Sequence, residues 1–280
     1  MQLDINAWLR YPKIDMHCHA WNLEDEAKEA ISAEQLIRSG DMLGISEYWC
    51  SSPIVCGRIG TVAEVGREND AVLRMMRRFP QRIRGWCFVI PAHYQGALDE
   101  IERCLDLGMI GIKLYNQYRI DEAAVYPVIE KAIERKVPIL EHAGFLQARE
   151  HLDNQPRISN GLHFAAVNQV YPEAMLIHAH TGGGGDWEQT LRAMRHTSPN
   201  LYCDISGSNL DDGQVEQAVA DMGPDRVLFG TDGTMAGSVG KVIDATLDDP
   251  VKERIFWDNA AAMLAPQGAT PLHQREEVAT

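Results

Sequence analysis

The chain has 280 residues, and its 26 lysines and arginines against 40 aspartates and glutamates give a formal net charge of −14. An acidic chain without a basic cluster suits neither a nucleic-acid backbone nor an anionic membrane surface. With 45% hydrophobic residues and no run near the roughly 18 apolar residues of a membrane span, the composition is that of a globular protein with one large domain or two small ones.

The six cysteines are scattered without CxxC pairs, so neither a disulfide framework nor a zinc ribbon is expected. The N-terminal residues lack the charged start and apolar core of a secretory signal. Together these features predict free thiols and a reducing, cytoplasmic location.

Short runs rich in apolar and β-branched residues alternate with amphipathic segments along the chain. The expected strands cover residues 13–19, 43–49, 83–89, 109–115, 137–142, 174–180, 200–206 and 226–231. Their starts lie about 30 residues apart, which is the size of a βαβ unit. Eight such units predict an α/β fold, a single distorted (β/α)8 barrel over residues 1–265. The rival is a doubly wound open sheet, although no glycine-rich phosphate-binding motif supports its nucleotide-binding form.

Polar residues mark the expected starts of several helices. Ser32 and Thr61 each precede an amphipathic segment and are expected as N-caps. Asp121 precedes a third helical segment, where Pro127 falls in the first turns and its missing N–H costs little. The polar segment 266–280 is expected to be a frayed tail.

The first expected strand carries a His-x-His pair at its end. Because side chains on a strand alternate, Asp15, His17 and His19 are expected on one face. Met16 and Cys18 are expected on the other face, toward the covering helices. Two imidazoles at positions i and i+2 can hold one metal ion, and a hydrogen-bonded polar pair is the alternative.

Further side chains that bind metals or move protons stand at the ends of later strands. They are Lys113, His142, His178, His180 and Asp232. Strand ends converge on one face of a barrel, so these residues are expected to meet in one pocket. His178, two residues before His180, is expected to point inward but deeper, as core support.

The ordered motifs IDMHCH, GIKLY, PILEHAG, IHAHTGGG and RVLFGTD, followed by DNAAAMLA, resemble those of the amidohydrolase superfamily, specifically amidohydrolase family 2. The resemblance runs from about Lys13 to Ala265 and implies a distorted (β/α)8 barrel that binds one or two divalent metals. Members of the family hydrolyse amides, lactones and esters, and some decarboxylate instead.

The resemblance also implies a role for each matching residue. His17, His19 and His142 resemble metal ligands, and Asp232 resembles a residue that is both metal ligand and general base. His180 resembles a catalytic histidine that activates water or polarises the substrate. The implied cofactor is a divalent metal, zinc before manganese, and one ion rather than two. Such an ion can lower the pKa of bound water to about 7.

Lys113 allows two interpretations. It resembles either a carboxylated lysine that bridges two metals or a cation that binds substrate, and the second is the expectation here. Tyr115 and Arg119 follow the same strand and are expected to bind substrate, Arg119 through an anionic group. Asp15 is expected to orient a ligand imidazole or a neighbouring backbone group.

The sequence therefore predicts a metal-dependent hydrolase that acts on a small amide, lactone or ester, with Asp232 as general base. A non-oxidative decarboxylase with the same metal site is the first rival, and a non-catalytic metal-binding protein is the second. The expected partner is a small molecule, with no nucleic acid or membrane, and a homo-oligomer is left open.

Overall fold

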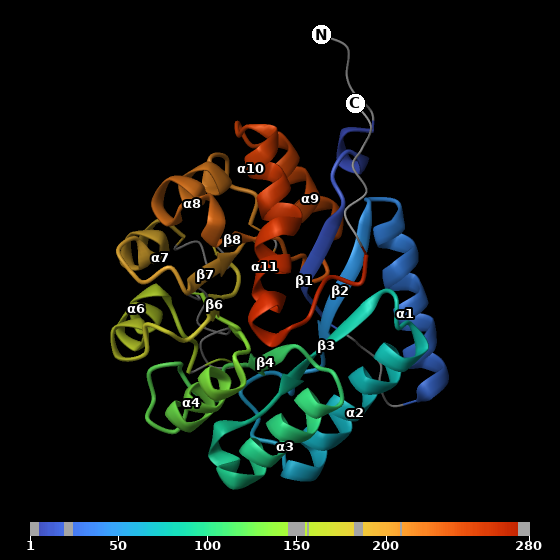
Figure 1. The fold of residues 1–280 in the computed structure, drawn as a ribbon, viewed down its shortest axis with the longest axis vertical. Helices are drawn as coiled ribbons and strands as arrows, with labels where there is room; N and C mark the ends of the chain where they lie inside the picture. The colour runs from blue at the N-terminus through green and yellow to red at the C-terminus, as the bar shows by residue number, and fades with distance from the viewer. Residues whose placement is uncertain are drawn as a thin grey trace.

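The computed structural model describes residues 6–19, 25–144, 155, 157–181, 187–207 and 209–273. Eight parallel strands, each followed by a helical segment, form one ring with the helices outside (Figure 1). The strands are β1 (Lys13–His19), β2 (Ile45–Ser51), β3 (Ile83–Phe88), β4 (Gly111–Leu114), β5 (Ile139–Glu141), β6 (Leu176–His178), β7 (Leu201–Asp204) and β8 (Val227–Leu228). Their spatial order equals their chain order, as in a (β/α)8 barrel.

Backbone hydrogen bonds join β1 to the last strand and close the sheet. The Met16 N–H donates to the Phe229 carbonyl at 3.1 Å, and the Asp232 N–H donates to the His17 carbonyl at 2.8 Å. The predicted barrel is therefore confirmed, and the rival open sheet is wrong because an open sheet would leave these edges unpaired.

The helices of the outer layer are α1 (Glu26–Asp41), α2 (Val62–Arg78), α3 (Gln95–Asp106), α4 (Tyr126–Arg135), α6 (Gly161–Val170), α7 (Trp187–Met194), α8 (Gln214–Met222), α9 (Met235–Asp244) and α10 (Asp249–Glu253). The helix α11 (Asn259–Leu264) follows a π-helical turn, η4 (Arg254–Asp258). Among the described helices, none has the length and apolar character needed to cross a bilayer.

Two of the predicted helix starts are corrected by the structure. α1 begins after Asp25, whose carboxylate accepts the Ala27 N–H at 2.7 Å, so Ser32 lies inside the helix. The segment after Asp121 first makes turns, and α4 begins at Tyr126 with Pro127 in its first turn. The cap of α1 is a polar residue earlier in the chain than Ser32, and α4 follows Val125, whose side chain makes no capping hydrogen bond, so no polar residue marks the start of α4.

The start of α2 is confirmed. Thr61 is its N-cap: the hydroxyl accepts the Glu64 N–H at 3.2 Å, and the Glu64 carboxylate accepts the Thr61 N–H at 2.7 Å. This reciprocal capping box satisfies two backbone donors that the helix leaves unpaired.

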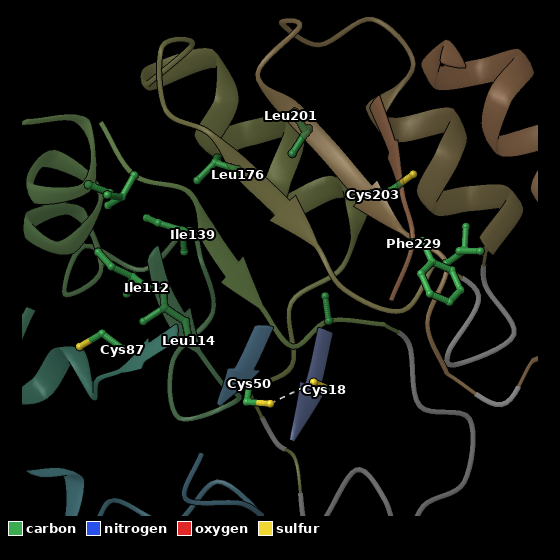
Figure 2. Packing of buried hydrophobic residues seen from close by; sticks show 14 of the residues in the cluster. Cys18, Cys50, Cys87, Ile112, Leu114, Ile139, Leu176, Leu201, Cys203 and Phe229 are labelled. Carbon is green, nitrogen blue, oxygen red and sulfur yellow. Dashed lines mark hydrogen bonds between the residues drawn. The ribbon is translucent and has the colours of Figure 1, made fainter. Parts of the chain in front are cut away.

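The apolar core has two layers. The outer core lies between strands and helices and includes Leu176, Leu201 and Phe229 (Figure 2). The interior core lies inside the barrel and includes Trp49 and Trp86. Both layers are buried, so the short strands are held from inside and outside.

The helix α11 closes the amino-terminal end of the barrel, and it lies across the centre of the ring in Figure 1. The Asn259 amide donates to the Val227 carbonyl at 2.8 Å, and Met263 and Leu264 pack into the interior core. Functional side chains can therefore collect only at the opposite end, where the strands finish.

The segment after Ala265 is attached to the barrel as far as His273, although the sequence predicted a frayed tail. The Leu272 N–H donates to the Glu47 carboxylate at 2.6 Å, and the His273 ring contacts the Gln81 carbonyl at 2.6 Å. Residues 274–280 lie outside the described residues.

All six cysteines are free, as the sequence predicts, and only Cys56 is exposed. Cys18 faces the outer core, with its sulfur 3.3 Å from that of Cys50 on the neighbouring strand (Figure 2). Burial raises the pKa of the Cys18 thiol well above its ordinary value, so this thiol stays protonated and unreactive.

Close packing at the start of β4 predicts the effect of one methyl group. A Cβ built on Gly111 would meet the Trp86 ring and lie 2.6 Å from the Pro138 carbonyl oxygen. We expect Gly111→Ala to lower the free energy of unfolding by about 1–3 kcal/mol, measured by urea denaturation. The control is Gly66→Ala in α2, where a Cβ meets nothing within 4 Å and stability is expected to rise by up to about 1 kcal/mol. Equal stability of Gly111→Ala and the parent would contradict this account of the packing.

Candidate metal and proton-transfer site

Six polar side chains meet at the carboxyl ends of the strands. They are His17 and His19 from β1, Lys113 from β4, His142 after β5, His180 after β6 and Asp232 after β8. The His19 Nε2 lies 3.0 Å from the Asp232 carboxylate, and the His17 Nε2 lies 4.0 Å from the same oxygen. The barrel thus brings together residues separated by more than 200 positions, as the sequence predicts.

The imidazoles of His142 and His180 form the second half of the cluster. The His142 Nδ1 lies 3.0 Å from the His180 Nε2, and the His180 Nδ1 lies 3.8 Å from the Asp232 carboxylate. Tyr115 stacks on the His142 ring with centroids 4.2 Å apart and planes 18° from parallel. The structure therefore places Tyr115, a predicted substrate-binding residue, against a histidine of the site.

The donor set fits a divalent metal ion. His17, His180 and Asp232 each offer one ligand atom, and these atoms all lie within 4.8 Å of one another. Imidazole nitrogen and carboxylate oxygen suit zinc and manganese alike. This trio includes His180, which the sequence predicted as a catalytic residue rather than a ligand. Of the other predicted ligands, His19 contacts Asp232 and the His17 ring, and His142 contacts His180.

Burial keeps the imidazoles of His19, His142 and His180 neutral. It lowers the pKa of His19 to about 4 and that of His180 to about 3, because the charged form loses its water. Burial also lowers the pKa of His142 well below its usual value. A neutral imidazole has a nitrogen lone pair free for a metal ion, so these histidines are prepared to act as ligands at neutral pH.

Asp232 carries the negative charge of the cluster. Burial opposes ionisation, but the hydrogen bond from His19 and the neighbouring histidines hold the pKa of Asp232 well below its usual range. The residue sits at φ 46°, and its N–H is fixed by the His17 carbonyl at 2.8 Å. A backbone held in this strained region is typical of functional residues.

Lys113 lies inside the cluster rather than at its edge. Its Nζ is 3.0 Å from the His17 Nε2, and the side chain is fully buried. Burial lowers the pKa of Lys113 to about 8, so the amine is still mostly protonated at neutral pH. A protonated Nζ next to this nitrogen would compete with a metal ion for the His17 lone pair.

The strand alternation expected at β6 is broken. His178 points outward, where its ring packs 4.9 Å from that of Phe164 on α6, so its predicted inward direction is wrong. His180 would also point outward in a regular strand, but its φ of 58° turns the side chain into the site. Alternation places side chains only while the backbone remains extended.

The expected alternation in β1 also fails. Ile14 and Met16 both belong to the interior core, so the predicted direction of Met16 toward the covering helices is wrong. A register shift between Asp15 and Cys18 lets His17 face the site as well. Asp15 binds backbone, one of its two predicted roles: its carboxylate accepts the Thr231 N–H at 2.9 Å and the Thr231 hydroxyl at 2.6 Å. Asp15 thereby supports the turn that carries Asp232.

Arg119 is not brought to the cluster. Its Nε pairs with the Asp121 carboxylate at 3.2 Å, and its backbone N–H donates to the Glu122 carboxylate at 2.9 Å. Its predicted role in binding an anionic substrate group therefore has no contact with the six clustered residues to support it.

Sequence reasoning missed two residues of the site, Asp204 and Ser206. Asp204 ends β7, is fully buried, and its carboxylate lies 2.8 Å from the His17 Nδ1. The Ser206 hydroxyl lies 2.8 Å from the His180 Nδ1. The available signal was a carboxylate at the end of a buried strand in NLYCDIS, the same position that Asp232 has after β8.

Comparison with known proteins agrees with this architecture. A family model described as Amidohydrolase matches residues 14–265. No curated protein matches the chain.

Solved structures give the same picture of the fold. A Staphylococcus aureus protein described as an amidohydrolase is 18% identical, with 91% of this chain and 99% of that chain covered and a TM-score of 0.73. A dihydroxybenzoic acid decarboxylase from Polaromonas sp. JS666 is 18% identical, with 91% and 97% covered and a TM-score of 0.68. A 4-oxalomesaconate hydratase from Rhodopseudomonas palustris is 16% identical, with 91% and 96% covered and a TM-score of 0.67. At these identities the likeness is one of fold alone.

Removal of one ligand candidate should separate metal binding from folding. We expect His17→Ala to fold but to lose at least about tenfold in metal affinity, because the loss of a residue that only hydrogen-bonds a metal ligand already costs about tenfold. Metal content after dialysis, measured by atomic emission, is the readout. The control is His178→Leu, because both ring nitrogens of His178 lack a partner in the described structure and its ring faces away from the site. Full metal content in His17→Ala would remove this residue from the site.

Replacement of Lys113 tests the competition for His17. We expect Lys113→Met to bind a divalent metal about ten to a hundred times more tightly, because a hydrogen bond to a charged group contributes about 1.5–3 kcal/mol. The measurement is competition with a coloured chelator. Weaker binding would instead show that Lys113 supplies a ligand, as a carboxylated lysine would, and unchanged binding would show that it does not oppose the metal.

Proposed function

The chain belongs to the amidohydrolase family, and from this premise we propose that it is a metal-dependent decarboxylase of a small carboxylic acid. The observation that carries the proposal is the buried Lys113, a cation 3.0 Å from the His17 Nε2 inside a cluster of imidazoles. A buried ammonium favours an anionic substrate group, which a carboxylic acid has and a neutral amide, lactone or ester lacks. The hydrolase predicted from the sequence becomes the second candidate.

Several similar structures support this order of candidates. They include a 2,6-dihydroxybenzoate decarboxylase from Rhizobium and a 5-carboxyvanillate decarboxylase from Sphingomonas paucimobilis, 16% and 15% identical to this chain. The Polaromonas decarboxylase was solved with bound manganese and an inhibitor. We therefore propose an aromatic carboxylic acid as the substrate class and manganese or zinc as the metal.

His17, His180 and Asp232 would hold the metal, and the His19 Nε2 lies 3.0 Å from the Asp232 carboxylate. When bound, the metal supplies positive charge that polarises an oxygen of the substrate. The loss of this ion should therefore abolish turnover while the barrel remains folded.

Decarboxylation breaks the bond between the carboxylate carbon and its neighbour. The electron pair stays on the neighbouring carbon, which takes up one proton, and carbon dioxide leaves. We assign the transfer of this proton to the Asp232 carboxylate, which is ionised in the free site and can first accept a proton from a substrate hydroxyl. His19, 3.0 Å from that carboxylate, orients it.

Hydrolysis is the second candidate because it makes the same demand on Asp232. An ionised carboxylate beside a metal site can take a proton from water and pass it to a leaving group. The family description favours this reaction. The two reactions differ in their products, so they can be separated directly.

The experiment incubates the metal-loaded protein with hydroxybenzoates that carry ¹³C in the carboxylate, and in parallel with lactones, amides and esters. We expect labelled carbon dioxide, and we expect Asp232→Asn to lower its rate by at least about a hundredfold at unchanged fold. The control is Asp99→Asn, because Asp99 lies on the exposed surface of α3. Ester, amide or lactone cleavage without carbon dioxide would favour the second candidate. No turnover with metal bound would favour a non-catalytic protein.

A further inference from the structure

One buried carboxylate touches both halves of the site without facing its centre. Asp204 accepts from the His17 Nδ1–H at 2.8 Å through one oxygen. Its other oxygen accepts the His180 N–H at 3.0 Å, the Ser206 N–H at 2.9 Å and the Ser206 hydroxyl at 2.5 Å. Three elements of the barrel, β1, β7 and the end of β6, are thus joined at a single side chain.

The chemistry of these contacts fixes where the protons lie. An ionised carboxylate only accepts hydrogen bonds, so His17 must carry a proton on Nδ1. The Lys113 ammonium only donates and lies 3.0 Å from the His17 Nε2, so that nitrogen must offer its lone pair. Three donors, the N–H groups of His180 and Ser206 and the Ser206 hydroxyl, point at one oxygen of Asp204, which therefore acts as an acceptor. The free Nε2 of His17 is the atom that lies near Lys113 and Asp232.

The same reasoning extends to His180 through Ser206. The Ser206 hydroxyl donates to Asp204, so its lone pairs remain for the His180 Nδ1–H at 2.8 Å. His180 then presents Nε2 to His142, 3.0 Å away. The hydrogen bond from the His180 N–H to Asp204 also holds the residue at its φ of 58°, the conformation that turns it inward.

We propose that Asp204 is the positioning residue of the site, acting directly on His17 and through Ser206 on His180. Asp204 determines which nitrogen of each imidazole carries the proton and which one offers a lone pair. The proposal rests on the site rather than on the reaction, so it holds for a decarboxylase and for a hydrolase alike.

The variant Asp204→Asn makes the sharpest test. An amide has one acceptor oxygen and one NH2 group, so one side of it must place a donor against the donors that Asp204 now receives. We expect the ¹⁵N imidazole spectrum of the metal-free protein to show His17 with its proton on Nδ1 in the parent. In Asp204→Asn we expect a mixture of the two tautomers, together with metal binding about ten to a hundred times weaker.

Ser206→Ala tests the contact that runs through the hydroxyl. It removes a group that lies 2.8 Å from the His180 Nδ1 and 3.2 Å from the His17 Nδ1, but it leaves the Asp204 carboxylate 2.8 Å from the His17 Nδ1. Because this shorter contact holds the His17 proton, we expect the His180 signals to change and those of His17 to keep the Nδ1–H form. This variant also keeps the proposal testable if Asp204→Asn does not fold.

The control is Asn69→Ala, which removes another buried polar side chain. The Asn69 side chain accepts the Phe88 N–H at 2.8 Å and, in the described structure, hydrogen-bonds to none of the histidines named above. This control variant should lower stability and leave the imidazole signals of His17 and His180 unchanged. A folded Asp204→Asn with an unchanged His17 tautomer would overturn the proposal, as would Ser206→Ala without any change at His180. Because these spectra need neither metal nor substrate, failure here is distinct from failure of the proposed reaction.

Discussion

Closure of the barrel between β1 and the end of β8 is the interaction on which the site depends. The His17 carbonyl accepts the N–H groups of both Thr231 and Asp232, at 3.2 and 2.8 Å. The same two backbone segments carry the His-x-His pair and the carboxylate that faces it. The hydrogen bonds that complete the fold are therefore also the ones that bring a carboxylate within 3.0 Å of His19.

Burial gives the closed site its chemical character. His19, His142 and His180 are neutral because they have lost their water, while hydrogen bonds and the nearby histidines keep Asp204 and Asp232 ionised. Asp15 also accepts hydrogen bonds, from Thr231, yet burial raises its pKa to about 7. The difference between these acids lies in the histidine side chains that lower the pKa of Asp204 and Asp232, since all three carboxylates are largely removed from solvent.

The fold and the place of the site could be predicted from the sequence, because parallel strands converge wherever the chain repeats the βαβ unit. This reasoning needed only the position of His17 or Asp232 at the end of a strand. The directions of single side chains could not be predicted in the same way. In β1, Ile14 and Met16 face inward and a register shift brings His17 to the site as well. A left-handed backbone turned His180 away from the face that His178 occupies. Asp204 was missed because its role comes from contacts with residues distant in the sequence, and no local pattern encodes those.

The helix that closes one end of the barrel has a consequence for traffic through the molecule. Trp49, Trp86 and Trp257 fill the interior core between α11 and the site. In the part of the chain that the structure describes, the packed core gives molecules no route through this end. In the proposed reaction, substrate, water and products would therefore share the opposite end of the barrel, and a bound product would keep the next substrate out. The packing that stabilises the barrel would then also make each turnover wait for the previous product to depart.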